Sequence, residues 1–79
     1  MYLEILTPGK KVFAGEISLI KVPGSDGSFE VLNNHAPIIS TLRKGQLWIK
    51  PQEGVKQTFD VMGGVVEVLQ NKVIVLAEV

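Results

Sequence analysis

Residues 17–32 read Ile17-Ser18-Leu19-Ile20-Lys21-Val22-Pro23-Gly24-Ser25-Asp26-Gly27-Ser28-Phe29-Glu30-Val31-Leu32, and this stretch decides the fold. Its first six residues are rich in large apolar side chains and read as a strand, as do the last four. Between them, residues 23–28 contain a Pro-Gly pair suited to a type II turn and an Asp-Gly pair suited to a primed hairpin turn. The stretch predicts two strands joined by an exposed loop. Because both alternating sets of residues 17–22 contain large apolar groups, we expect that strand to be central and buried on much of both faces.

The same pattern continues outward in both directions, because short apolar stretches with period two alternate with turn signals. Besides the two strands above, we expect strands at residues 2–7, 11–13, 38–42, 46–50, 58–61, 65–69 and 72–76. The last two should form a hairpin across Gln70-Asn71, and Asn33-Asn34 should form a corner because asparagine tolerates positive φ. A single sheet of so many strands would leave its apolar face in water. The sequence therefore predicts an all-β fold, a two-sheet β-sandwich or flattened barrel of nine or ten short strands, with residues 1–79 as a single domain.

Composition argues against several classes of function. Eight basic and eight acidic side chains cancel, and no stretch concentrates Lys or Arg beyond Lys10-Lys11 and Arg43-Lys44, so we expect no nucleic-acid partner. With no cysteine and one histidine, disulfides, thiolate metal sites and imidazole clusters are excluded, and we expect no metal and no cofactor. The acidic side chains have neither calcium-loop spacing nor the pairing of catalytic carboxylates, and we expect them to be solvated: Asp26, Glu30, Glu53, Asp60 and Glu67.

Few side chains of this sequence are candidates for catalysis or ligand binding. Only His35 could act as a base for a nucleophile, so we expect no catalytic residue and no enzyme activity. Two interpretations of His35 stay open, a turn histidine bonded to its neighbours or a partner contact. Trp48 is either a solvent-facing platform or, as we favour, a partly buried residue covering the edge of the core. Gly63-Gly64 predicts a bulge or bend between strands rather than a phosphate loop. The three phenylalanines, Phe13, Phe29 and Phe59, should fill the core.

The chain opens directly into Tyr2-Leu3-Glu4-Ile5-Leu6, with an acidic residue among the apolar ones and no basic leader. No apolar run approaches the length of a membrane span. We therefore expect an unanchored chain without direct membrane insertion.

Residues 22–37 carry a more specific signal. They resemble the signature Pro-Gly-x-x-Gly-x-x-Gly-hydrophobic-x-x-x-His-Ala-Pro of the epsilon subunit of bacterial F-type ATP synthase, the delta subunit of mitochondria, most closely at Pro23-Gly24 and His35-Ala36-Pro37. The resemblance continues on both sides of the signature, through residues 3–8, 12–16, 42–49, 62–68 and 72–77. It therefore covers essentially the whole chain.

This resemblance implies a ten-stranded β-sandwich on the central rotor stalk of a proton- or sodium-translocating enzyme. Such a subunit binds the gamma subunit by one surface and the polar loops of the membrane-embedded c-ring by one end, and touches the catalytic subunits at most indirectly. It performs no catalysis itself. By position, the gamma contact would include Thr7, His35 and Ala36, and the c-ring contact would include Asp26, Gly27, Ser28 and Phe29. The implied location is peripheral, at the cytoplasmic face of the bacterial inner membrane.

Three departures from the family pattern affect these expectations. Ser28 stands where an acidic residue is common and Glu30 where a glycine is common, which changes the charge expected at the c-ring contact. Asn33-Asn34 replaces a Pro-Gly pair but keeps the capacity to turn. The sequence ends at Val79, where most bacterial members continue into a helical hairpin, so we assign no inhibitory role. The alternative is a free-standing ligand-binding β-sandwich module with aromatic contacts around Trp48 or Tyr2.

Overall fold

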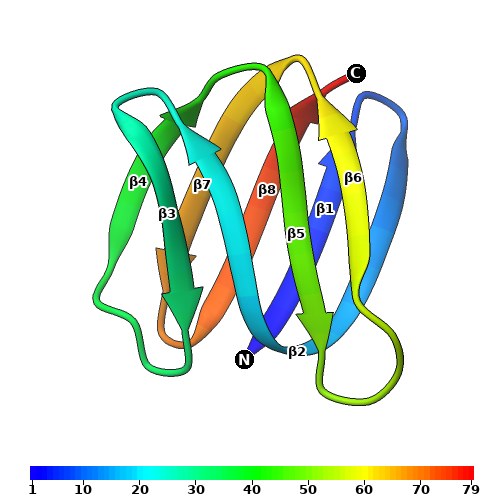
Figure 1. The fold of residues 1–79 in the computed structure, drawn as a ribbon, viewed down its shortest axis with the longest axis vertical. Helices are drawn as coiled ribbons and strands as arrows, with labels where there is room; N and C mark the ends of the chain where they lie inside the picture. Colours follow the sequence, from blue (N-terminus) through cyan, green and yellow to red (C-terminus); the bar gives the residue numbers. More distant parts are fainter.

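The computed structural model describes residues 1–79 and consists of eight strands with turns between them (Figure 1). No helix in it has the length and apolar character needed to cross a bilayer. The strands are β1 (Tyr2–Thr7), β2 (Lys10–Gly24), β3 (Gly27–Leu32), β4 (Ile38–Leu42), β5 (Gly45–Pro51), β6 (Gln57–Val61), β7 (Gly63–Leu69) and β8 (Lys72–Glu78). The all-β prediction is confirmed.

The expected number of strands was too high, because the strands expected at residues 11–13 and 17–22 are parts of the single long strand β2. Gly15 lies between these two segments and does not adopt positive φ. The chain therefore passes through this point without turning. The strand contains two irregularities of pairing instead. The register with β1 shifts between Ile5 and Leu6 of β1, and the register with β5 shifts between Ile17 and Leu19 of β2.

Strand β2 belongs to both layers of the sandwich. Its first half pairs with β1, from Tyr2↔Glu16 to Thr7↔Lys10, and its second half lies between β3 and β5. We call the layer of β1, β8, β7 and β4 the β8 sheet, and the layer of β3, the second half of β2, β5 and β6 the β5 sheet. The other edge strand of the β8 sheet, β4, also pairs with β2, at Leu42 and Gly24. Five strands thus close into a ring, which is the flattened barrel that the sequence predicts.

The core lies between the two sheets and contains sixteen buried apolar residues in one cluster, with no buried polar side chain. Alternate residues of each strand point inward, for example Val66 and Val68 of β7 and Val73 and Val75 of β8. Each such side chain contributes about 1.5–3 kcal/mol to folding by leaving water. All three phenylalanines pack against this cluster, as expected. The rings of Phe13 and Phe59, 6.2 Å apart and edge to face, cover it between β2 and β6.

The connection between β2 and β3 is tighter than the sequence suggested. Pro23 and Gly24 are buried at the end of β2, and the turn contains only Ser25 and Asp26. Positive φ occurs at Gly27, the first residue of β3, so the expected loop over residues 23–28 and its primed turn are wrong. Pro23 is tolerated in the strand because it lies beyond Lys21, the last residue of β2 that pairs with β5.

Two other turns form as predicted. Gln70 and Asn71 have φ of 50° and 60°, the pattern of a type I′ turn, and they join β7 and β8 in the expected hairpin. Asn34 has φ of 63° at the corner after β3. Gly63 and Gly64, by contrast, begin β7 instead of separating two strands.

Polar contacts hold the lower end of the molecule in Figure 1 together, where the N-terminus, residues 33–37, 52–56 and the 70–71 turn lie. The amino group of Met1 donates to the Ile17 carbonyl oxygen (3.1 Å) and to Asn33 Oδ1 (2.8 Å). The N–H of Asn34 donates to Asn71 Oδ1 (2.8 Å). These bonds fasten the loop that carries His35 to the body of the sandwich.

Candidate partner interface

The outer face of the β8 sheet is apolar, although it faces solvent. Its outward-pointing side chains include six large apolar ones: Leu6, Ile39, Val65, Leu69, Ile74 and Leu76. Ile39 is 71% exposed and Leu76 53% exposed. Sheets with one face in water normally carry polar residues there, and a contiguous apolar surface marks an interaction site. We call this surface the apolar face.

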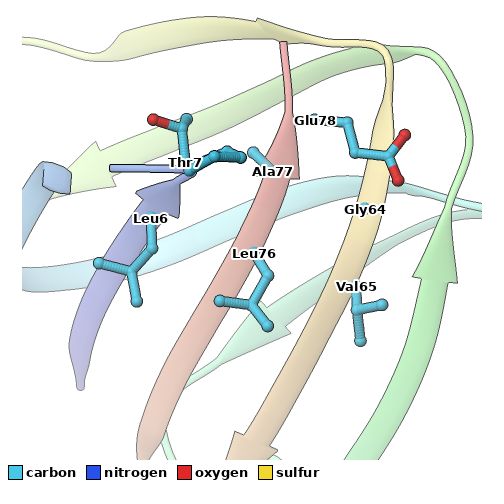
Figure 2. Close-up of a pocket in the computed structure, with 8 residues that line it drawn as sticks. Leu6, Thr7, Gly64, Val65, Leu76, Ala77 and Glu78 are labelled. Carbon is cyan, nitrogen blue, oxygen red and sulfur yellow. The ribbon is translucent and has the colours of Figure 1, made fainter. Parts of the chain in front are cut away.

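The two largest hollows of the surface lie on the apolar face. The upper one, of about 460 Å³, is lined by Leu6, Val65 and Leu76 together with Thr7 and the end of β8. Figure 2 shows that these three apolar side chains come from neighbouring strands and project on the same side. The lower hollow, of about 390 Å³, lies between β4 and β7, and Pro37 and Ile39 contribute to it. Each hollow is large enough to accept an apolar side chain of another molecule.

The opposite surface, on the β5 sheet, is mostly polar. Gln46 Nε2 donates to Asp60 Oδ1 across β5 and β6 (2.9 Å). Trp48 lies on this outer surface, 41% exposed, with Lys56 Nζ 4.3 Å from its ring centre. The expectation that Trp48 covers the edge of the core is therefore wrong. The two outer surfaces of the sandwich differ in kind, and only one has the character of a buried interface.

The charged groups beside the apolar face are largely paired with each other. Glu4 accepts from Lys11 Nζ at 3.2 Å and lies 3.4 Å from Lys72 Nζ. The hydrogen bond from Lys11 is the main cause that lowers the pKa of Glu4 below its ordinary value, and Lys72 adds to it. No group of three or more His, Asp or Glu side chains comes together in the structure.

The profile of one family, described as the β-sandwich domain of the delta/epsilon chain of ATP synthase, matches residues 1–79. The chain belongs to this family.

The ATP synthase epsilon chain of Chlorobaculum tepidum is 41% identical over 76 residues, which are 96% of this chain and 86% of the relative. That of Caulobacter vibrioides is 36% identical, over 99% of this chain and 90% of the relative. Against the longer epsilon chain of Pelotomaculum thermopropionicum, identity is 48% over 55% of the relative's length.

Two solved structures contain a chain with this fold. A chain in the central stalk and c-ring structure of Tetrahymena thermophila mitochondrial ATP synthase superposes with a TM-score of 0.84 and 26% identity, covering all of this chain and 63% of that one. A chain of the Euglena gracilis mitochondrial enzyme superposes with a TM-score of 0.86 over 95% of this chain and 48% of that one, at 19% identity, which shows the fold alone. The resemblance to the epsilon subunit is confirmed.

The three residues expected to approach gamma lie at two ends of the sandwich. Thr7 ends β1 at the upper end of Figure 1 and lines the upper hollow. His35 and Ala36 lie in the β3–β4 loop at the lower end, next to Pro37 of the lower hollow. The structure therefore does not gather them into one patch, but the apolar face runs between them. His35 Nδ1 is 2.6 Å from the Ala36 carbonyl oxygen, the local bond of a turn histidine, and its contact with a partner stays a prediction.

The residues expected at the c-ring contact lie at the upper end. Asp26 and Ser28 are exposed there, whereas Phe29 packs against the core. The neighbouring β4–β5 turn, Arg43-Lys44, is tied to the same place, because the Arg43 N–H donates to the Pro23 carbonyl oxygen (2.9 Å). Sequence reasoning missed this basic pair as a neighbour of Asp26, since only the fold brings the two turns together.

Sequence reasoning also missed the apolar face, although a signal was present. In residues 65–69 the inward Val66 and Val68 alternate with the outward Val65 and Leu69, so both sets of positions carry large apolar side chains. The same holds for residues 73–76. A strand that is apolar on both sides is covered on both sides in a complete assembly.

Proposed function

We propose that this chain is a non-catalytic part of the central rotor stalk of an F-type ATP synthase, where it links the gamma subunit to the c-ring and helps couple proton or sodium flow to ATP synthesis. The observation that carries the proposal is the apolar face on a chain of this family. A face with several half-exposed leucine and isoleucine side chains is unfavourable in water and is stabilised by a partner. The subunit is a peripheral member of a membrane-bound complex, and its bacterial relatives support a place at the cytoplasmic face of the inner membrane.

We assign the gamma subunit to the apolar face. Thr7 marks one end of this face, and His35 and Ala36 mark the other. The molecule measures 26 Å along its longest axis, so a partner that contacts all three residues lies along the whole face. The two hollows between them can receive the apolar anchors that carry most of the binding energy in such interfaces.

The c-ring contact is assigned to the upper end, at Asp26, Gly27 and Ser28, with Phe29 anchoring the turn from inside. The exposed pair Arg43-Lys44 beside Asp26 makes the charge of this end mixed. Strand β2 runs from this end into both sheets and connects it rigidly with the apolar face. The alternative of a free-standing ligand-binding module has less support, since Lys56 covers Trp48 and the four hollows of the surface lie elsewhere.

Calorimetric titration of the chain with purified gamma subunit tests the proposal. Leu76 and Leu32 provide a matched pair, because they are 53% and 52% exposed and point outward from strands of opposite sheets. We expect one-to-one binding that Leu76→Arg weakens at least tenfold, since a charge would face the apolar partner, whereas Leu32→Arg leaves it unchanged. His35→Ala should weaken binding to a smaller extent.

Thermal unfolding of each variant shows that it is folded before it is titrated. A folded wild-type chain that does not bind gamma overturns the proposal. Equal weakening by the Leu76 and Leu32 variants would contradict the assignment of gamma to the apolar face.

A further inference from the structure

One charged side chain stands in the middle of the apolar face. Glu67 points outward from β7 and is exposed. Its cross-strand neighbours are Ile39 in β4 and Ile74 in β8. Along its own strand the outward neighbours are Val65 and Leu69. Glu67 is thus surrounded by apolar side chains on all four sides of the sheet surface.

No cation of this chain neutralises Glu67. Lys72 is the basic residue beside it, and both line a third, smaller hollow of about 220 Å³. The ammonium of Lys72, however, lies 3.4 Å from the Glu4 carboxylate, and Glu67 is in no ion pair. Covering the apolar face with an apolar partner alone would remove water from this carboxylate without replacing its hydrogen bonds, which is strongly unfavourable.

We infer that the partner on the apolar face places a lysine or arginine side chain against Glu67, between the apolar anchors that fill the hollows. This inference rests on the proposed function, in which the partner is the gamma subunit. Glu67 borders both the lower hollow and this smaller one, so its carboxylate can be reached from either. The aliphatic stem of a basic side chain can lie on Ile39 or Leu69 while its charged end meets the carboxylate.

A pair between Glu67 and a basic side chain of the partner determines which partner binds and where it lies on the apolar face. Apolar contacts alone allow a partner to slide along the strands, whereas a charge pair in the middle of the interface fixes one register. A partner with an acidic or large apolar group at this point is rejected, because the carboxylate would then be buried unpaired. Glu67 is therefore a specificity-determining residue of the interface.

The experiment measures the dissociation constant for purified gamma subunit with Glu67→Gln and Glu67→Lys at low and high salt. Glu30→Gln and Glu30→Lys are matched controls, because Glu30 is an exposed strand glutamate on the opposite sheet. We expect Glu67→Gln to raise the dissociation constant about tenfold or more and to reduce its salt dependence, and Glu67→Lys to raise it further. The Glu30 variants should bind like wild type. A gamma variant with the facing basic residue changed to glutamate should restore binding of Glu67→Lys.

The outcomes separate the inference from the proposed function. If wild type binds gamma and Glu67→Gln binds equally well or better, the inference is overturned while the stalk function stands. If wild type does not bind gamma, the proposed function itself fails. If sedimentation shows that the free chain forms dimers that Glu67→Gln weakens, the basic group belongs to a second copy of this chain, and the assignment to gamma is wrong.

Discussion

Gly64 occupies a position in β7 that no other residue fits. A Cβ placed there would clash with the Leu76 carbonyl oxygen of β8, and the φ of 140° is strained for any L residue. The backbones of β7 and β8 pair at this point, Gly64 with Ala77, and leave no room for a side chain. Glycine is therefore required here by contact as well as by conformation.

We expect Gly64→Ala to lower the free energy of unfolding by about 3 kcal/mol, a large part of the stability of a domain of this size. Chemical denaturation measures the loss. Gly54→Ala is the control, because Gly54 also has positive φ (105°) but a Cβ there meets nothing within 4 Å. Its loss should be about 1 kcal/mol. Equal losses in the two variants would show that the backbone contact with β8 is unimportant.

The ion pairs of Glu4 make a second prediction at the residue scale. Because Lys11 and Lys72 lower the pKa of Glu4 from its ordinary value of 4.5, the folded state favours the ionised carboxylate. This stabilisation is present above pH 4.5 and is lost as the pH falls through the lowered pKa. The thermal stability of wild type should exceed that of Glu4→Gln at pH 7, and the difference should vanish in acid. A difference in thermal stability between wild type and Glu4→Gln that stays constant between pH 7 and pH 3 would contradict this prediction. The variant Glu53→Gln is the control for the change in net charge.

The β7–β8 turn places two non-glycine residues in the left-handed region, at different cost. Asn71 tolerates it and its Oδ1 also accepts from the Asn34 N–H, whereas Gln70 has no such compensation. We expect Gln70→Gly to raise the free energy of unfolding by about 0.5 kcal/mol. Asn71→Gly should lower it by about as much, because the bond to Asn34 is lost. Denaturant titration of both variants measures these changes in the free energy of unfolding. A higher value for Asn71→Gly than for wild type would show that the bond between Asn34 and Asn71 is unimportant.

At the scale of elements, the sequence predicted most strand positions, because the strands alternate and the turns carry Gly, Asn or Pro. The boundaries of β1 and β4 were correct, and the hairpin of β7 and β8 was too. Two errors came from reading Gly and Pro only as turn formers. Gly15 and Gly24 lie within β2, and a Cβ at Gly24 would lie 2.6 Å from the Gly27 carbonyl oxygen. Glycine at position 24 allows β2 and β3 to approach closely beside their two-residue turn, a packing requirement that residue type alone does not indicate.

The interface was less accessible to sequence reasoning than the strands were. The family resemblance led to residues that, apart from Phe29, lie in turns or near strand ends: Thr7, His35, Ala36, Asp26, Gly27, Ser28 and Phe29. The apolar face between them is assembled from β1, β4, β7 and β8, and the order of these strands in the sheet cannot be deduced from local patterns. The setting of Glu67 depends on Ile39, which is distant in sequence and adjacent only through the pairing of β4 with β7.

At the scale of the whole molecule, the sharing of β2 between the sheets predicts that both sheets unfold together. We expect native-state hydrogen exchange to give the same free energy of opening for Val75 in β8 and for Ile20 in β2, which are fully buried on opposite sides of the core. The amides of residues 53–56, outside any strand, should exchange much faster. A clearly lower value at Ile20 than at Val75 would show that the β5 sheet opens by itself.

The parallel pairing of β1 with β8 has a mechanical consequence. These two strands are neighbours, and the termini lie at opposite ends of the molecule (Figure 1). Tension between the termini would load the five pairs from Tyr2↔Lys72 to Leu6↔Leu76 in shear, so that their hydrogen bonds must break together. Tension across the β7–β8 hairpin would instead unzip its pairs one after another. The sandwich thus resists force strongly along one direction and weakly along another, a directional stiffness that suits a part through which a rotating machine transmits load.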